Sequence, residues 1–185
     1  METLECIKSR RSIRHFLDKE IPDNLVEQLL EAVRWAPSWA NTQCWEVIVV
    51  KEQAMKEKIA EVMGQNYSTK AVIAAPVVMI MCAAKGKSGF NQGVPTTNKG
   101  DWFMFDLGIA SQNLCLAAHA LGLGTVHVGH FDHARMDQLL ELPENIETVE
   151  IIPAGYPARE GTAPPRKELS EFVHMNHYSQ AYQGH

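Results

Sequence analysis

Two kinds of apolar pattern alternate along the chain, and each predicts a different type of element. Apolar residues at helical spacing predict helices at about Thr3–Arg10, Pro22–Ala36, Gln53–Met63 and Asp101–Leu121. Short continuous apolar runs predict buried strands at Val47–Val50, Pro76–Cys82, Thr125–Val128 and Val149–Ala154. No internal repeat or linker divides these elements, so we expect a single domain over residues 1–185.

The predicted helix Asp101–Leu121 carries apolar residues around most of its circumference. Helices that are apolar nearly all round are buried. In a chain this small, part of that surface is expected to be covered by a second subunit, because large apolar patches mark interfaces. The alternative is a central helix that its own chain covers completely.

A polar stretch, Lys85–Gly100, precedes this helix and is rich in Gly, Ser, Asn and Thr. Its length and composition predict a long surface loop. Together with Trp102 it forms a candidate lid over residues 85–102.

The composition is that of an ordinary globular protein, with 45 % hydrophobic and 21 % charged residues. The net charge of −5 gives no general attraction to nucleic acid or to an anionic membrane. No apolar run approaches the ~20 residues of a membrane span, and the acidic start, Met1–Glu5, is unlike a secretory signal. We therefore expect a soluble, cytoplasmic protein.

The four cysteines, Cys6, Cys44, Cys82 and Cys115, form no CxxC or CxxH pair. This spacing favours neither a zinc site nor a dithiol redox motif. Free thiols suit a reducing compartment. Any redox chemistry would therefore come from a bound cofactor.

The first candidate site is the basic cluster Arg10-Arg11-Ser12-Ile13-Arg14, in a turn after a predicted helix. Guanidinium groups and a hydroxyl can surround a phosphate, because each planar guanidinium donates parallel bonds to an oxyanion. The alternative is a solvated basic turn paired with nearby glutamates.

The second candidate is the loop from Ala36 to Trp45, in which Pro37 is followed by Ser38, Asn41 and Gln43. Polar side chains beside tryptophans suit a heterocycle with carbonyl and imine edges, such as an isoalloxazine ring. The alternative is a polar turn in which Asn41 satisfies its own backbone.

These motifs resemble the FMN-dependent nitroreductase family, in which an Arg-Arg-Ser-Ile-Arg turn precedes Ala-Pro-Ser-x-x-Asn-x-Gln-x-Trp. The resemblance continues in order from about Thr3 to Val173, through Ala75–Val78, Asp106–Leu114, Leu121–Thr125, Ile152–Pro157 and Pro165–Lys167. It implies an α+β fold, an α/β/α sandwich with a central mixed or antiparallel sheet of four strands flanked by helices. It also allows an added C-terminal strand from the partner subunit.

The resemblance implies a set of FMN-binding residues: Arg10, Arg11, Ser12, Arg14, Pro37, Ser38, Trp39, Asn41, Gln43, Lys70, Val128, Gly129, His130 and Arg166. The basic cluster and Arg166 would hold the phosphate and ribityl chain. The loop after Pro37 would lie along the flavin and reach the partner's FMN, and Lys70 would stabilise the anionic reduced flavin. Residues 128–130 would place a backbone N–H at flavin N5.

The implied activity is transfer of hydride from NADH or NADPH through FMN to an electron-poor acceptor by a ping-pong mechanism. Nitroaromatics, quinones and flavins are candidate acceptors, and no side chain acts as a catalytic acid, base or nucleophile. A homodimer with FMN at the subunit interface is implied. The alternatives are reductive dehalogenation, flavin fragmentation or heterocycle oxidation on the same fold, and a non-catalytic FMN-binding protein.

Three features stand apart from the family pattern. Cys44 replaces the usual proline before Trp45 and is either a thiolate redox partner or a bystander. Trp39 replaces a small residue and would narrow the pocket.

Three histidines have a spacing that could suit a metal ion: His127, His130 and His133. Side chains on a strand alternate faces and no acidic cluster supports them, so we expect no metal site; His130 near the substrate is the alternative.

Overall fold

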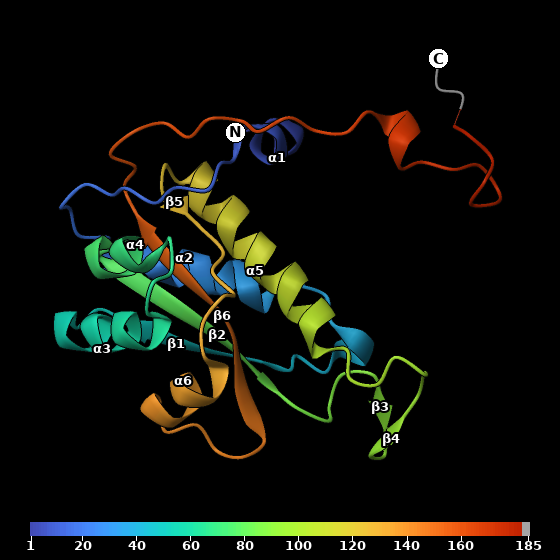
Figure 1. Cartoon of the computed structure of the whole chain (residues 1–185), viewed down its shortest axis with the longest axis horizontal. Coiled ribbons are helices and arrows are strands. Elements are labelled where there is room, and N and C mark those ends of the chain that lie inside the picture. The colour runs from blue at the N-terminus through green and yellow to red at the C-terminus, as the bar shows by residue number, and fades with distance from the viewer. Residues whose placement is uncertain (183–185) are drawn as a thin grey trace.

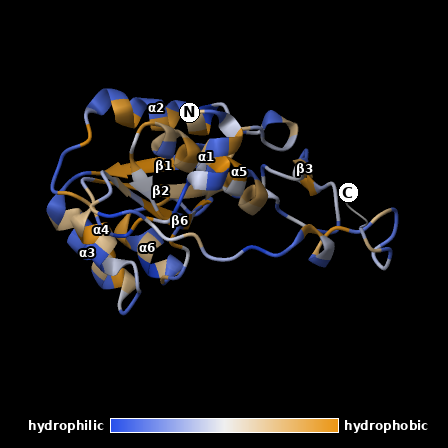
Figure 2. Ribbon diagram, turned by 90° about the horizontal axis from the view of Figure 1, so that it is seen from above, coloured by the Kyte–Doolittle hydropathy of each residue, from blue (hydrophilic) through white to orange (hydrophobic). Residues whose placement is uncertain are grey.

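The computed structural model describes residues 1–182, and in it a four-stranded antiparallel sheet lies between two layers of helices (Figures 1 and 2). The sheet has the order β1 (Trp45–Val50), β2 (Val77–Ala84), β6 (Ile146–Gly155) and β5 (Gly124–Thr125). One layer holds α2 (Asp23–Arg34) and α5 (Phe103–Ala120), with α1 (Thr3–Ser9) packed on α5. The other holds α3 (Gln53–Met63), α4 (Thr69–Ala74) and α6 (His133–Leu139). The expected α+β sandwich is confirmed.

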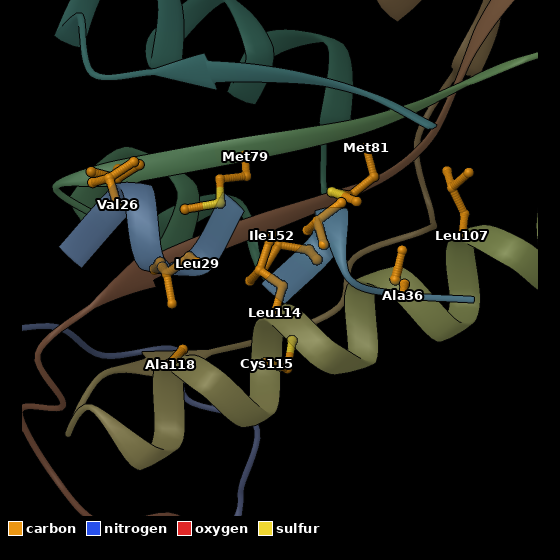
Figure 3. Packing of buried hydrophobic residues seen from close by; sticks show 14 of the residues in the cluster. Val26, Leu29, Ala36, Met79, Met81, Leu107, Leu114, Cys115, Ala118 and Ile152 are labelled. Atoms are coloured by element: carbon orange, nitrogen blue, oxygen red, sulfur yellow. The ribbon is translucent and has the colours of Figure 1, made fainter. Parts of the chain in front are cut away.

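Strand β2 is the centre of the core, and every one of its residues is buried. Side chains alternate across a strand, so Met79 and Met81 pack toward α2 and α5 while Ile80 packs toward α3 and α6. Figure 3 shows the first of these clusters, which brings together Leu29 of α2, Leu114 of α5 and the two methionines of β2. Because both faces are covered, the strand is apolar throughout and lacks polar alternation.

The segment after α1 lies between β5 and the chain that leaves β6. Ile13 N donates to Thr125 O at 2.9 Å, and Ser12 pairs with Thr125 in parallel. On the other side, Ala158 N donates to His15 O at 2.9 Å. Pairing on both sides holds the basic cluster against the sheet edge, although the cluster belongs to no helix or strand.

The predicted strand Thr125–Val128 is wrong in extent, because the ladder is interrupted after Thr125. Thr125 pairs with Ala154, and Val128 exchanges two backbone hydrogen bonds with Ile151. Continuing this register places Val126 opposite Pro153, whose nitrogen carries no hydrogen to donate. The proline therefore divides the strand into β5 and an isolated bridge at Val128.

Two short helices, α4 and α6, were not expected from the sequence.

The polar stretch between β2 and α5 contains a small hairpin of β3 (Phe90–Asn91) and β4 (Val94–Pro95). Short 3-10 turns at Trp39–Asn41 and Leu169–Glu171 complete the elements. Residues 159–162 still line a cleft with the segment after α1, and beyond Thr162 the chain leaves the body and runs outward as an extended C-terminal arm, residues 163–182 (Figure 1).

The α5 helix is buried along one side only within a single chain. Leu107, Leu114 and Ala118 are fully buried, whereas Met104 and Phe105 keep 59 % and 58 % of their surface exposed.

None of the described helices is both long and apolar enough to cross a membrane.

We expect Gly124→Ala to lower the free energy of unfolding by about 1–3 kcal/mol, the range for forcing extra atoms into a packed core. An added Cβ would lie 2.7 Å from Ile13 Cβ, and the backbone of Ile13 is tied to Thr125. Urea unfolding of the cofactor-free protein measures the change. Gly129→Ala is the control, since a Cβ there meets nothing within 4 Å; equal stability losses in both variants would contradict the packing argument.

Candidate functional site

The basic cluster contains two guanidinium groups with unused hydrogen-bonding capacity. Arg10 Nη1 and Arg14 Nε are buried and have no hydrogen-bond partner among the described residues. Arg11 differs, because its Nη1 donates to Lys8 O at 2.6 Å and to Arg10 O at 2.8 Å. Buried polar atoms in native proteins are nearly always paired, so Arg10 and Arg14 are the members of the cluster suited to an external anion.

A cleft of about 430 Å³ lies directly beside this cluster. Its lining comes from three parts of the chain: Ser12, Ile13, Arg14, His15, Tyr67, Arg159, Glu160, Gly161 and Thr162. The Arg14 guanidinium also lies 5.3 Å from the centre of the Tyr67 ring. A hydroxyl and two guanidinium groups around one cleft are donors of the kind that can bind a phosphate group.

Arg166 does not line this cleft, contrary to the expectation that it joins Arg10 and Arg14. It lies in the exposed C-terminal arm, and the hydrogen bonds that its Nη1 forms within residues 1–182 go only to the carbonyls of Pro164 and Pro165, at 3.5 Å. The arm has left the body of the chain at this point (Figure 1). Arg159, which sequence reasoning missed, takes the corresponding place in the cleft. The sequence signal for it was an arginine four residues after the end of the last strand at Gly155.

The segment that contains Val128, Gly129 and His130 lies next to the loop before α4. Asn66 Nδ2 donates to His130 O, and Arg14 reaches Tyr67 in the same loop. The Val128 N–H donates to Ile151 O at 3.0 Å and is therefore used within the sheet. Gly129 and His130 are exposed, so their amides are the ones available to a ligand.

Lys70 lies on α4 with an exposed side chain. The structure places its helix close to the basic cleft through the neighbouring Tyr67, which lines that cleft. In residues 1–182 the Lys70 ammonium group forms no hydrogen bond or ion pair.

The second candidate loop is strained. Ala40, Asn41 and Gln43 have positive φ values of 44°, 56° and 47°, which residues other than glycine rarely adopt. Ser38 Oγ accepts from Gln43 N at 2.9 Å and closes the turn. Asn41 and Gln43 remain exposed and line a second cleft of about 450 Å³, together with Arg34, Trp35, Ala36 and Pro37.

A buried carboxylate, Asp106 on α5, holds this loop in place. It accepts from Trp39 N at 3.0 Å and from Ser88 Oγ at 2.7 Å, and the Cys44 thiol lies 3.7 Å away. Burial, followed by the nearby Asp106 charge, raises the pKa of Cys44 to about 12. Cys44 is therefore a protonated thiol at neutral pH and does not act as a thiolate. Sequence reasoning missed Asp106, although a charge in an otherwise apolar helix was visible.

Aromatic side chains join the same loop to residues 85–102. The rings of Trp39 and Trp102 are 5.2 Å apart, and Trp102 meets Phe105 edge-on at 5.5 Å. Trp39 therefore faces the candidate lid.

The two groups of candidate residues lie at opposite ends of α5. The basic cluster adjoins its C-terminal end, where Ser9 Oγ lies 2.8 Å from His119 Nε2. The strained loop adjoins its N-terminal end at Asp106. The helix rises 1.5 Å per residue, so these contacts are roughly 20 Å apart. Within one chain the two groups line different clefts.

The three histidines serve different contacts. His127 Nδ1 lies 2.7 Å from Glu150 Oε2, and both ring nitrogens of His133 face backbone carbonyls of Thr148 and Gly129. His130 is exposed. Over residues 1–182 no group of His, Cys, Asp and Glu is arranged to hold a metal ion.

Comparison with known proteins decides the family. The model described as the nitroreductase family matches residues 7–156. The chain belongs to the nitroreductase family. The enzyme is thus an oxidoreductase, and its relatives carry names of that class.

Three relatives illustrate the similarity. A Methanothermobacter thermautotrophicus protein, whose name combines NADH dehydrogenase and NAD(P)H nitroreductase, is 39 % identical over 162 residues, which is 85 % of this chain and 78 % of that protein. An FMN reductase [NAD(P)H] of Bacillus subtilis is 29 % identical, over 95 % of this chain and 74 % of that protein. The Vibrio harveyi NADPH:FMN oxidoreductase, solved with NAD+, superposes with a TM-score of 0.81 at 28 % identity, covering 96 % of this chain and 78 % of that one.

We expect the stabilising contribution of the His127–Glu150 pair to disappear at high pH. The Cys115 thiol and the Glu150 carboxylate raise the pKa of His127 to about 10, from about 6.5 in an unfolded chain. The contribution is complete below about pH 6.5 and is lost as the pH rises through about 10. Urea unfolding should therefore show Glu150→Gln less stable than the parent at about pH 6, with the difference shrinking above about pH 10.

Glu144→Gln is the control, because Glu144 is exposed and forms no ion pair among the described residues. A Glu150→Gln difference that stays constant across this pH range would contradict the assignment.

Proposed function

We propose that this nitroreductase-family enzyme binds FMN and passes hydride from NADH or NADPH to an electron-poor organic acceptor. The observation that carries the proposal is a pair of buried guanidinium nitrogens without a partner among the described residues, one on Arg14, which lines the cleft, and one on Arg10 in the adjoining turn. The Vibrio harveyi structure contains NAD+ and its protein is named for FMN, which supports the same choice of cofactor and donor.

The FMN phosphate fits the cleft beside the basic cluster. Ser12, Arg14 and Arg159 line it, and Arg10 adds a donor from the adjoining turn. Arginine is suited to this role because each guanidinium donates two parallel, charge-assisted bonds to one oxyanion. The exposed amides of Gly129 and His130 would then face the ring, and Lys70 would lie toward its anionic edge.

We further propose that a homodimer completes the site. The contacts that attach the basic cluster and the strained loop to α5 are roughly 20 Å apart along the helix, and Asn41 and Gln43 are exposed, so a second copy would bring its own loop to the cofactor. The exposed strip of α5 that includes Met104 and Phe105 offers an apolar surface for that contact. The C-terminal arm offers more, since Leu169, Phe172 and Met175 are 57 %, 55 % and 45 % exposed.

Bound FMN would supply the hydride-transfer chemistry. The chain's own residues hold the phosphate, orient the ring and exclude water, and no side chain is required as acid, base or nucleophile. Residues 85–102, with Trp102 packed on Trp39, act as a lid. Donor and acceptor use the space under this lid in turn, which is the ping-pong order.

Anaerobic stopped-flow mixing of the purified, FMN-loaded protein with NADH and with NADPH tests the function. We expect rapid bleaching of the flavin by at least one of them, followed by reoxidation with a quinone or nitroaromatic acceptor. Protein that takes up no FMN would overturn the proposal. Flavin-loaded protein that neither nucleotide bleaches would also overturn it and favour a non-catalytic flavin-binding protein.

We expect Arg10→Ala combined with Arg14→Ala to weaken FMN binding at least tenfold. Each charge-assisted bond contributes about 1.5–3 kcal/mol, and about 1.4 kcal/mol corresponds to a factor of ten. Flavin fluorescence titration measures the dissociation constant. Arg11→Ala is the matched control, because the Arg11 guanidinium is bound to carbonyls of its own turn. Equal affinities of the double variant and the parent would place the phosphate elsewhere.

A further inference from the structure

Asp106 combines nearly complete burial with contacts to three separate segments. Only 1 % of its surface is exposed, and no lysine, arginine or histidine pairs with it in the described part of the chain. Hydrogen bonds to neutral donors alone therefore stabilise this carboxylate. Burying an ion is costly unless such bonds compensate, so each donor is strongly tied to the carboxylate.

Two of these contacts hold the ends of the strained loop. Trp39 N lies 3.0 and 3.1 Å from the two carboxylate oxygens of Asp106, just before the first left-handed residue. Cys44 Sγ contacts the same carboxylate just after the last one. Residues in the left-handed region persist only where the surroundings hold them. Asp106 is the side chain that supplies this restraint at both ends.

The third contact comes from the candidate lid. Ser88 is fully buried, and its hydroxyl donates to Asp106 Oδ2 at 2.7 Å. The same residue accepts from Trp102 N through its carbonyl at 3.0 Å. Ser88 therefore ties both ends of the lid to the carboxylate that holds the strained loop.

Asp101 offers a natural contrast at the base of the same lid. Its carboxylate accepts from Gly86 N and from Phe103 N at 3.1 Å. These contacts stay within the lid and the first turn of α5. Among the described residues, Asp101 forms no hydrogen bond to the strained loop, so it stabilises the lid alone.

We propose that Asp106 is a positioning residue that couples the lid, residues 85–102, to the strained loop that presents Asn41 and Gln43. When the lid is docked, Ser88 supports the carboxylate that restrains the loop. When Ser88 is released, the carboxylate loses its shortest hydrogen bond and the loop loses restraint. The inference rests on the proposed function, in which Asn41 and Gln43 lie along the partner's flavin and an acceptor enters beneath the lid.

Hydrogen–deuterium exchange of the FMN-loaded protein tests the coupling through Ser88→Ala, Asp106→Asn and the double variant. We expect Ser88→Ala to speed exchange roughly tenfold in residues 85–102 and also in residues 39–44, the loss expected for about one hydrogen bond. Adding Ser88→Ala to Asp106→Asn should produce no further change in residues 39–44. A side chain with only a general structural role would give additive effects.

Asp101→Asn is the matched control and should speed exchange in the lid alone. Unchanged exchange at residues 39–44 in Ser88→Ala would overturn the coupling, as would additive effects in the double variant. Ser88→Ala leaves the buried carboxylate intact, so it decides the question even where Asp106→Asn does not fold.

The FMN dissociation constant of Ser88→Ala separates this inference from the proposed function. We expect it to rise severalfold, since a looser loop contacts the cofactor less. Coupled exchange with an unchanged dissociation constant would support the coupling and overturn the placement of Asn41 and Gln43 at the flavin. Loss of coupling in a protein that still binds FMN and reacts with nicotinamide would overturn the inference and leave the proposed function standing.

Discussion

Burial of β2 on both faces is the constraint from which the rest of the architecture follows. A strand with no polar side must be covered twice, so the sheet requires a helix layer above and another below. The α5 helix takes part in the upper layer through Leu107 and Leu114. Its two ends thereby come to rest at opposite edges of the sheet, and each end supports one of the candidate binding segments.

The position of α5 explains how polar groups on distant parts of the chain are attached to one packed core. Asp106 faces the interior from the first turns of the helix, and His119 meets Ser9 near the last turn. Side chains at such positions are held more precisely than side chains on loops, because the helix that carries them is rigid. The loops at both ends are irregular, yet each is attached to a rigid element.

The elements with strong patterns could be predicted from the sequence, and their bounds agree closely with the structure. The helix predicted at Gln53–Met63 has those bounds, and the apolar run at Pro76–Cys82 lies within or beside β2. The short helices α4 and α6 carry too few apolar turns to give a pattern. The break in the strand at Pro153 depends on a partner strand that is distant in sequence, so only the pairing reveals it.

The candidate site could be predicted to the extent that it depends on local motifs. The sequence pointed to Arg10 and Arg14, and the structure shows them with unpaired buried nitrogens. Arg159 lines the cleft because the chain returns past His15 after the last strand, and no local sequence pattern encodes this return. The link between Asp106 and Ser88 is likewise a tertiary contact, formed only when the lid folds back on α5.

The buried guanidinium nitrogens of Arg10 and Arg14 also affect the stability of the folded chain before it binds a cofactor. Buried donors without acceptors raise the free energy of the folded chain, so an anion that occupies them lowers it. A ligand that binds only the folded state shifts the folding equilibrium in proportion to its concentration. The cellular concentration of a phosphorylated cofactor would then influence how long newly made chains resist proteolysis, in addition to how many of them carry the cofactor.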